Sequence, residues 1–442
     1  MNAQPISHWL NSAERIVAWR GEQALMLSSL RRQVVALSRT LQALPGTQWA
    51  LCFDDGYRFC VALLAAWYAG KTPVIPGHCR AALLNEMNDA LDGVISDLPL
   101  DTTLSLLTFQ EEEAEGELPA LPANAALVLF TSGSTGTPRR VVKSLAVLEQ
   151  ESRWLAALWG KQLAGCRVIA SVSHQHLYGL TFRILLPLAL GRPFSAQQIF
   201  YSEQLAEQQR YGRHVLISSP AFLRRLDDSL IASDCALTVS AGGMLTWRDA
   251  QHARKALKCT VNEIYGSTET GIIAWRQRDA DEAVWRCFPG VKLEQTAPDR
   301  WQVFSSLIDC NAGWPLDDRL IVTQQGSFQL AGRHDRVVKI EDKRVSLSEI
   351  ERRLLALPGV TDAVALAVTR HERQAIGVVV TLNAPLSEPD YHAQKRRWKQ
   401  ALQPWLEPVA MPRHWRVVDT IPVTSQSKRA WPQIEELFHV AD

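Results

Sequence analysis

The chain has 442 residues, 47% of them hydrophobic, which is enough apolar sequence for two domains with separate cores. Its 47 basic and 46 acidic residues leave a net charge of +1, so no global field favours nucleic acid or an anionic membrane surface as a partner. The eight cysteines are scattered without a C-x-x-C pair, which indicates reduced thiols rather than a disulfide framework or a zinc site.

The N-terminal sequence does not have the pattern of a targeting segment. Residues 1–20 carry charges and lack the continuous apolar stretch of a signal peptide. The longest apolar run, over residues 59–69, is too short to cross a bilayer. We therefore expect a cytoplasmic protein without a membrane span.

Helices and strands alternate in the first part of the chain. Apolar residues at helical spacing predict a helix over 28–44, with Ser28 or Ser29 as its N-cap and Pro45 and Gly46 at its end. A strand over 49–53, a helix over 57–70 and a strand over 71–76 follow. Because strand–helix–strand units favour parallel pairing, this order predicts a doubly wound α/β sheet.

The same rhythm continues beyond a polar segment over 110–122, which is typical of a surface linker. An apolar run over 125–130 predicts a buried strand. Near Gly332 the pattern changes to a compact α+β arrangement. The remaining predicted elements are strands over 167–172, 214–217, 237–239, 360–368 and 375–382, and helices over 220–230, 247–257, 348–357 and 391–406.

The segment after the strand over 125–130 is the most distinctive in the chain. It reads Thr131-Ser132-Gly133-Ser134-Thr135-Gly136 and ends in a stiff turn at Pro138 and a cation at Arg139. Glycines let several backbone N–H groups converge, and hydroxyls add donors, so the loop suits a polyphosphate. Its spacing differs from G-x-x-x-x-G-K-[ST], which argues against a kinase or ATPase of that class. Taken alone, the loop could equally be a flexible turn.

Five segments in order resemble the signature motifs of the acyl-adenylate-forming enzymes, the family of AMP-dependent acyl-CoA and aryl-CoA synthetases and ligases. The first is the loop over 131–139, similar to T-S-G-S-T-G-x-P-[KR]. Residues 262–271 resemble a Y-G-x-T-E segment and residues 332–339 resemble G-R-x-D-x-x-x-K. Residues 347–351 resemble L-G-E-I-E, and residues 421–428 resemble L-P-x-T-x-S-G-K. The resemblance spans nearly the whole chain and implies a short stand-alone member.

The resemblance implies two domains and two half-reactions. A large doubly wound α/β domain over 1–332 would be followed by a small, mobile α+β lid domain over 333–442, with a hinge at Asp335. Such enzymes use ATP and Mg²⁺ to convert a carboxylic acid into acyl-AMP and pyrophosphate. They then transfer the acyl group to the thiol of CoA or of a phosphopantetheinyl acyl carrier protein, forming a thioester. Two anions must meet in the first step, so catalysis is mostly charge neutralisation and positioning.

The resemblance also assigns nucleotide-site roles to individual residues. Thr268 and Glu269 correspond to the Mg²⁺-binding pair, and oxygen donors suit this hard cation. Lys428 corresponds to the catalytic lysine, although a lysine near a C-terminus is commonly a solvated charge. The implied nucleotide-binding set is Thr131, Ser132, Gly133, Ser134, Thr135, Gly136 and Arg139 for the phosphates, Tyr265 and Gly266 beside the adenine, and Asp318 and Arg333 for the ribose or phosphate.

By the same resemblance, the acid pocket lies near His176 and Tyr178. His176 would gate the acyl site, or could instead be a hydrogen-bonded core histidine. Amino-acid-activating members have Asp at the position of Leu177, and a buried ammonium facing leucine would be unpaired and costly. The second wall of the pocket would come from Ala241, Gly242 and Gly243.

Several residues depart from the family pattern. Arg139 stands where the family has lysine, which keeps the charge and adds a bidentate fork. Asp317 replaces a glycine beside Asp318, so the ribose assignment could shift by one residue, and Ser427 replaces a glycine beside Lys428. Asp342 replaces the glycine that would line the pantetheine tunnel, which bears on thioester formation.

The identity of the acid and of the acceptor stays open. His176 and Tyr178 slightly favour an aryl acid over an aliphatic one. A basic cluster over 395–399 could meet an acidic carrier protein, or could be a solvated helix face. The alternatives are a medium- or long-chain fatty acyl ligase and a degenerate member that binds nucleotide or acyl groups without turnover. We expect no nucleic-acid partner.

Overall fold

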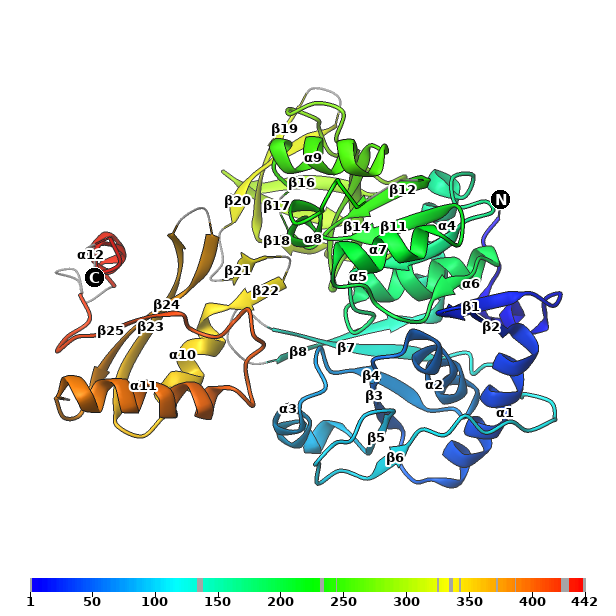
Figure 1. Cartoon of the computed structure of the whole chain (residues 1–442), viewed down its shortest axis with the longest axis horizontal. Helices are drawn as coiled ribbons and strands as arrows, with labels where there is room; N and C mark the ends of the chain where they lie inside the picture. The colour runs from blue at the N-terminus through cyan, green and yellow to red at the C-terminus, as the bar shows by residue number, and fades with distance from the viewer. Residues whose placement is uncertain are drawn as a thin grey trace. The chain divides into compact units, whose positions relative to one another are not determined.

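The computed structural model describes residues 2–132, 138–230, 234–243, 245–323, 326–333, 337–341, 343–370, 373–385, 387–422 and 429–439. The chain forms two compact units. The larger contains Met1–Cys79, Leu84–Thr131 and Arg140–His334, and the smaller contains Arg80–Leu83, Ser132–Arg139 and Asp335–Asp442. The expected fold class is confirmed, because a large sheet-rich α/β part is followed by a smaller α+β part (Figure 1).

A six-stranded sheet occupies the first part of the larger unit (Figure 1). Its order is β6 (Leu106–Thr108), β5 (Gly93–Ser96), β3 (Gln48–Cys52), β4 (Thr72–Ile75), β7 (Ala126–Ser132) and β8 (Pro138–Ser144). The strands from β6 to β7 pair in parallel, as the alternating pattern predicts.

Helix α1 (Leu27–Ala43) precedes β3 in the chain, and helix α2 (Gly56–Tyr68) connects β3 to β4. Nearly every residue of α2 is buried, which explains why its sequence is apolar on all faces. The predicted helix over 28–44 is confirmed, but its predicted cap is wrong: Met26 is the N-cap residue and no side chain caps the helix. Strand β2 (Gln23–Met26) runs directly into α1, so Ser28 lies inside the first turn and its hydroxyl donates to Glu14 Oε1 at 2.8 Å.

A nine-stranded sheet forms the second part of the larger unit (Figure 1). Its central strands are parallel and its edges antiparallel. The order is β15 (Arg286–Cys287), β14 (Gly271–Gln277), β13 (Val261–Ser267), β12 (Cys235–Ser240), β11 (His214–Ser218), β9 (Arg167–Ala170), β10 (Phe194–Ser195), β1 (Ile16–Arg20) and β2.

The helices connecting these strands include α4 (Leu145–Trp159), α7 (Ser202–Gln209) and α9 (Trp247–Leu257), the last with the predicted bounds. The predicted helix over 220–230 is wrong beyond its first turns, because α8 spans only Pro220–Arg224. The chain turns there because the Asp227 N–H donates to the Ser202 hydroxyl at 3.0 Å, and the Asp227 carboxylate then accepts from Ser229. These local side-chain bonds compete with helical ones.

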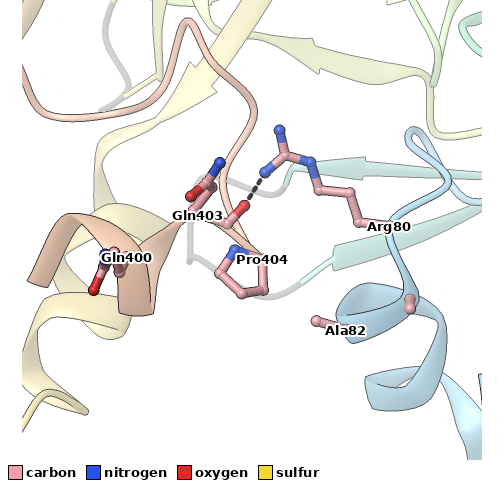
Figure 2. Close-up of a pocket in the computed structure, with 6 residues that line it drawn as sticks. Arg80, Ala82, Gln400, Gln403 and Pro404 are labelled. Carbon is pink, nitrogen blue, oxygen red and sulfur yellow. Dashed lines mark hydrogen bonds between the residues drawn. The ribbon is translucent and has the colours of Figure 1, made fainter. Parts of the chain in front are cut away.

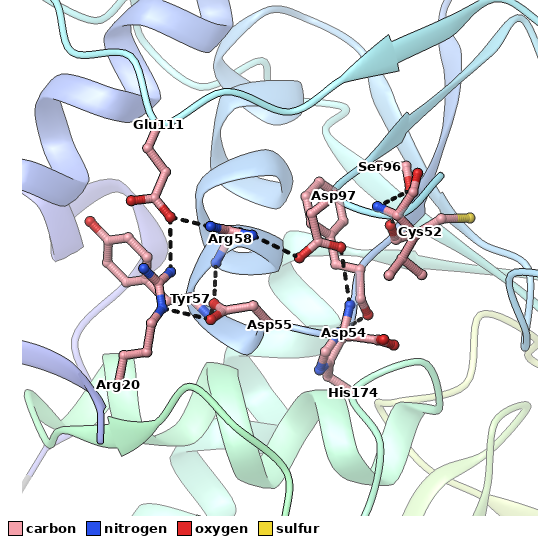
Figure 3. Close-up of polar contacts among 12 residues, drawn as sticks. Arg20, Cys52, Asp54, Asp55, Tyr57, Arg58, Ser96, Asp97, Glu111 and His174 are labelled. Atoms are coloured by element: carbon pink, nitrogen blue, oxygen red, sulfur yellow. Dashed lines mark hydrogen bonds and ion pairs between the residues drawn. The ribbon is translucent and has the colours of Figure 1, made fainter. Parts of the chain in front are cut away.

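A polar network ties the linker over 110–122 to the larger unit (Figure 3). Arg20 of β1 pairs with Asp55 at 2.9 Å and with Glu111 at 3.0 Å. Arg58 of α2 donates to the same Glu111 carboxylate at 2.7 Å. The acidic linker is therefore anchored at its first residues by two arginines from separate elements.

The remaining strands of the larger unit pair in antiparallel fashion. One sheet contains β16 (Lys292–Ala297), β17 (Arg300–Phe304) and β18 (Trp314–Leu316), and a hairpin pairs β19 (Asp318–Val322) with β20 (Phe328–Arg333). Across the part of the chain that the structure describes, no helix combines the length and the apolar character needed to cross a bilayer.

The smaller unit packs a three-stranded sheet against helices. Its order is β23 (Val360–Arg370), β24 (Arg373–Leu382) and β25 (His414–Val417), beside the hairpin β21 (Val337–Ile340) and β22 (Lys343–Ser346). Helices α10 (Leu347–Leu355), α11 (Glu388–Leu402) and α12 (Trp431–Glu436) complete it. The indole rings of Trp398 and Trp415 stack in its core at 5.5 Å. The Arg80 guanidinium donates to the carbonyl oxygen of Gln403 within this unit (Figure 2). It also donates to the Leu406 carbonyl oxygen.

Candidate nucleotide and metal site

The turn between β13 and β14 carries the predicted metal-binding pair, Thr268 and Glu269. Two glycines bracket this turn. A Cβ on Gly266 would lie 2.2 Å from the Gly271 carbonyl oxygen, and Gly271 has a positive φ of 68°. Only glycine fits such a close backbone approach without displacing the chain.

Hydroxyl side chains within the same turn accept hydrogen bonds from its backbone. The Ser267 N–H donates to Thr270 Oγ1 at 3.1 Å, and the Thr270 N–H donates back to Ser267 Oγ at 3.2 Å. Thr270 is buried, whereas the side chains of Thr268 and Glu269 are partly exposed. The turn thus holds two oxygen-bearing side chains at the end of a buried strand.

The entrance of the predicted phosphate loop meets this turn. Thr131, near the end of β7, donates from Oγ1 to Glu269 Oε1 at 3.2 Å. Two motifs that lie 138 positions apart in the sequence are therefore neighbours in the larger unit. This contact places Thr131, at the end of β7, beside the Glu269 carboxylate.

The loop itself lies largely outside the described residues. Of the predicted phosphate ligands, Gly133, Ser134, Thr135 and Gly136 are not described, and Ser132 is described only as the last residue of β7. The expected stiff turn at Pro138 and Arg139 is wrong, since these residues begin β8, and Arg139 is exposed. Proline is tolerated at the first position of a strand, where its missing N–H removes no ladder bond.

Tyr265 and Asp318, both predicted to bind the nucleoside, are in direct contact. The Tyr265 hydroxyl donates to Asp318 Oδ2 at 2.9 Å. The Tyr265 ring packs against Trp285 and Phe328, each at 5.7 Å between ring centroids, which fixes its orientation. Asp317 is exposed, so Asp318 is the carboxylate of the two that faces Tyr265.

Asp318 is also paired in register with Arg333 across the β19–β20 hairpin. The two residues predicted to contact the ribose or phosphate thus sit opposite one another at one end of this hairpin. The structure describes the backbone of Arg333 and not its side chain.

A buried lysine and a buried glutamate support the β13–β14 turn, and sequence reasoning missed both. Lys143 of β8 donates from Nζ to the carbonyl oxygens of Glu269 at 2.9 Å and Leu307 at 3.2 Å. Glu151 of α4 accepts from the Ile272 N–H at 2.9 Å and from Thr181 Oγ1 at 2.9 Å. Each side chain is only 3% exposed.

Burial changes the proton affinity of both groups. It lowers the pKa of Lys143, although the carboxylates of Glu151 and Glu269 partly offset the shift. It raises the pKa of Glu151, against the Lys143 ammonium and the two hydrogen bonds that the carboxylate accepts. A sequence signal existed, because Glu151 occupies a core-facing position between Leu148 and Leu155 on α4.

The predicted acid-pocket segments are joined by Tyr178. Its hydroxyl donates to the carbonyl oxygens of Ser218 at 3.1 Å and Val239 at 2.9 Å, at the ends of β11 and β12. This places the segment around Tyr178 beside the chain that leads into Ala241, Gly242 and Gly243. The two predicted walls of the pocket therefore lie together.

The histidines of this segment have different environments. His176 is exposed, and the core histidine is His174, which is 1% exposed. Arg183 donates to His174 Nδ1 at 3.2 Å, so Nε2 carries the proton and donates to the Phe53 carbonyl at 2.9 Å. Burial and the nearby Arg183 cation hold the pKa of His174 well below its usual value. Leu177 is 6% exposed and packs in the main core of the larger unit.

The smaller unit's predicted contributions are not described. Lys428, the hinge residue Asp335, Asp342 and Ser427 all lie outside the described residues. Among the residues that the structure does describe, no group of three or more His, Cys, Asp or Glu side chains is placed to hold a metal ion. The site contacts given above all lie within the larger unit.

Residues 11–295 match the sequence model of the AMP-binding enzymes. The chain belongs to the AMP-binding enzyme family. This match confirms the resemblance to acyl-adenylate-forming enzymes, and it covers the phosphate loop, the acid-pocket segments and the β13–β14 turn.

Similar proteins of known sequence include two bacterial 4-coumarate–CoA ligases. The chain is 27% identical over 259 residues to that of Cereibacter sphaeroides, covering 58% of this chain and 59% of the relative. It is 29% identical over 321 residues to that of Rhodobacter capsulatus, covering 71% of this chain and 77% of the relative. Enterobactin synthase component F of Escherichia coli is 23% identical over 460 residues, covering 86% of this chain but 35% of that longer protein.

Solved structures show the same fold at low sequence identity. An amide bond synthetase, McbA from Marinactinospora thermotolerans, superposes with a TM-score of 0.78 at 18% identity, covering 98% of this chain and 99% of that one. An o-succinylbenzoate CoA synthetase from Bacillus subtilis gives a TM-score of 0.81 at 15% identity, with 98% of each chain covered. These likenesses confirm the fold class.

Proposed function

We propose that the protein is an ATP-dependent carboxylate ligase that adenylates an aryl or other acyl carboxylic acid and then forms a thioester. The observation that carries this proposal is the contact of Thr131 Oγ1 with Glu269 Oε1 at 3.2 Å, which joins the phosphate-loop strand to the β13–β14 turn. The Tyr265–Asp318 pair supports it, since an aromatic ring and a carboxylate suit a nucleoside's base and ribose.

In the first half-reaction, a carboxylate oxygen of the acid bonds to the α-phosphorus of ATP, and the bond from that phosphorus to pyrophosphate breaks. The loop over 131–136 and Arg139 hold the phosphates, and Lys428 stabilises the developing charge. Thr268 and Glu269, partly exposed oxygen donors beside Thr131, would hold Mg²⁺. That ion would neutralise phosphate charge when bound.

In the second half-reaction, a thiolate attacks the acyl carbon of acyl-AMP, the thioester bond forms and AMP leaves. We assign the large domain to residues 1–332 and the lid to residues 333–442, with rotation at Asp335 exchanging Lys428 for the face near Asp342. The relatives named 4-coumarate–CoA ligase support CoA as the acceptor. A carrier protein is the alternative acceptor.

The acid is proposed to be an aryl acid without an α-amino group. The name of the 4-coumarate–CoA ligases supports an aryl substrate. Leu177, buried in an apolar environment, offers no counter-ion for a substrate ammonium. His176 and Tyr178 remain our candidates for gating and lining the acyl site.

The substrate assignment is tested by measuring pyrophosphate release with a panel of acids at fixed ATP and Mg²⁺. The panel contains hydroxylated benzoates and cinnamates, fatty acids of increasing length, and the proteinogenic amino acids. We expect release with an aryl acid to exceed release with any amino acid by at least about a hundred-fold, because an unpaired buried charge costs several kcal/mol.

Three other results would change the assignment. Preference for a long-chain acid would favour the fatty acyl ligase alternative. Nucleotide binding without pyrophosphate release for any acid would favour a binding protein without turnover. Activation of an amino acid as well as of the best simple acid would contradict the role given to Leu177.

A further inference from the structure

Lys143 and Glu151 have no assigned role in the proposed chemistry, yet both are buried charged side chains. Both side chains are 3% exposed. A charge removed from water is costly unless hydrogen bonds and an opposite charge compensate it. Lys143 lies within β8, and Glu151 lies within α4, so two separate elements bring these charges toward the β13–β14 turn.

Lys143 holds the backbone of Glu269 itself. Its Nζ donates to the Glu269 carbonyl at 2.9 Å and to the Leu307 carbonyl at 3.2 Å. An ammonium shared between two carbonyls from distant segments fixes their separation. Because the carbonyl and the side chain of one residue are joined through Cα, this contact also restricts where the Glu269 carboxylate points.

Glu151 holds the other end of the same turn. Its Oε1 accepts from the Ile272 N–H at 2.9 Å, and a Cβ added to Gly271 would lie 3.1 Å from that oxygen. Its Oε2 accepts from Thr181 at 2.9 Å, which fixes the carboxylate. The turn is therefore held at Glu269 by the lysine and at Ile272 by the glutamate.

The strands on both sides of the phosphate loop converge on Glu269. Thr131 of β7, before the loop, contacts the Glu269 carboxylate at 3.2 Å. Lys143 of β8, after the loop, contacts the Glu269 carbonyl. The two strands are neighbours in the six-stranded sheet, so Glu269 contacts both of them: β7 at Thr131 and β8 at Lys143, four residues beyond Arg139.

We propose that Lys143 and Glu151 are positioning residues that set the Glu269 carboxylate beside Thr131 of β7, so that Glu269 can hold the magnesium ion of a bound nucleotide. The inference rests on the proposed adenylation function but concerns nucleotide and metal binding, which can be measured without turnover. Neither side chain contacts the reacting atoms in this assignment.

Magnesium-dependent binding of a non-hydrolysable ATP analogue tests the proposal. Lys143→Met keeps the unbranched stem and removes the donors. We expect the gain in analogue affinity on adding Mg²⁺ to fall by about ten-fold or more, the usual scale for losing a group that orients a metal ligand. Affinity measured with EDTA should stay within about two-fold, because the turn acts through the metal.

The matched control is Lys71→Met. Lys71 Nζ also donates to two backbone carbonyl oxygens, those of Leu44 at 2.7 Å and Gly46 at 2.6 Å, but at a different place in the larger unit. We expect Lys71→Met to lower the melting temperature without changing the magnesium effect. An equal magnesium effect in wild type and Lys143→Met would overturn the proposal, as would an equal loss in both lysine variants.

A second variant covers the case in which Lys143→Met fails to fold. Lys143→Met with Glu151→Gln removes both charges together, so that no buried carboxylate is left without the nearby positive charge of Lys143. It should fold and still lose the magnesium effect, and retention of that effect would overturn the proposal. If wild type binds the magnesium complex but activates no acid, the proposed ligase activity fails while this inference stands; magnesium-independent binding by wild type overturns the inference.

Discussion

At the residue scale, the fold brings motif residues together, and the contacts of the residues that support them were not predictable. Thr131, Glu269, Tyr265 and Asp318 carry motif signals that identify them from sequence. Lys143 and Glu151 belong to no motif, and although helical spacing places Glu151 on the core-facing side of α4, it does not reveal which turn the side chain will contact. Their partners are backbone atoms of distant segments, which only tertiary structure specifies.

His174 gives a prediction for the pH dependence of stability. Its pKa is held well below the ordinary value of about 6.5 by burial and by Arg183, with a smaller opposing effect of the Phe53 carbonyl. Below about pH 6.5, His174 therefore binds a proton in the unfolded chain but stays neutral in the folded chain. Stability is full above that pH and falls as the pH is lowered, by up to about 1.4 kcal/mol per pH unit.

Denaturant unfolding between pH 7 and pH 5.5 measures this slope. His214, whose pKa is also lowered by burial, should add a second contribution of the same sign. His174→Gln can accept from Arg183 and donate to the Phe53 carbonyl, so it should fold and show a smaller slope than wild type. An unchanged slope in His174→Gln would contradict the assignment of a neutral, buried His174.

At the scale of elements, long periodic segments were predictable and their ends were not. The helix over 247–257 and the strands over 360–368 and 375–382 are confirmed as α9, β23 and β24. The helix over 220–230 ends early because the side chains of Ser202 and Asp227 bind the backbone instead. Ser28 does not cap α1, since a strand runs directly into that helix.

Asp55 provides a test at this scale. Its Oδ1 accepts from the backbone N–H groups of Tyr57 and Arg58, each at 2.9 Å, and its Oδ2 pairs with Arg20 at 2.9 Å. We expect Asp55→Ala to cost about 1–2 kcal/mol of unfolding free energy, because α2 loses its N-cap.

Asp55→Asn is the matched control for that change. Asparagine caps helices as well as aspartate does but cannot form the ion pair with Arg20, which is only partly buried. The loss in Asp55→Asn should be smaller than in Asp55→Ala by about 1 kcal/mol, measured by urea unfolding. Equal losses would mean that the ion pair, and not the cap, holds the start of α2.

At the scale of the whole molecule, the family and the fold class were predictable because five motifs occur in order along the chain. The family match over residues 11–295 confirms the family, and the arrangement of sheets confirms the class. The domain boundary at 332, the hinge at Asp335 and the role of Lys428 stay predictions, because they depend on residues beyond those described.

The central claim is that this chain makes an acyl adenylate, and acid-dependent exchange of labelled pyrophosphate into ATP tests it most directly. Wild type should catalyse the exchange with an aryl acid and Mg²⁺. Lys428→Ala should lose about a hundred-fold or more, the scale of removing one preorganised charge stabiliser, while still forming thioester from synthetic acyl-AMP. Absence of acid-dependent exchange in wild type, or equal loss of both half-reactions in Lys428→Ala, would contradict the account.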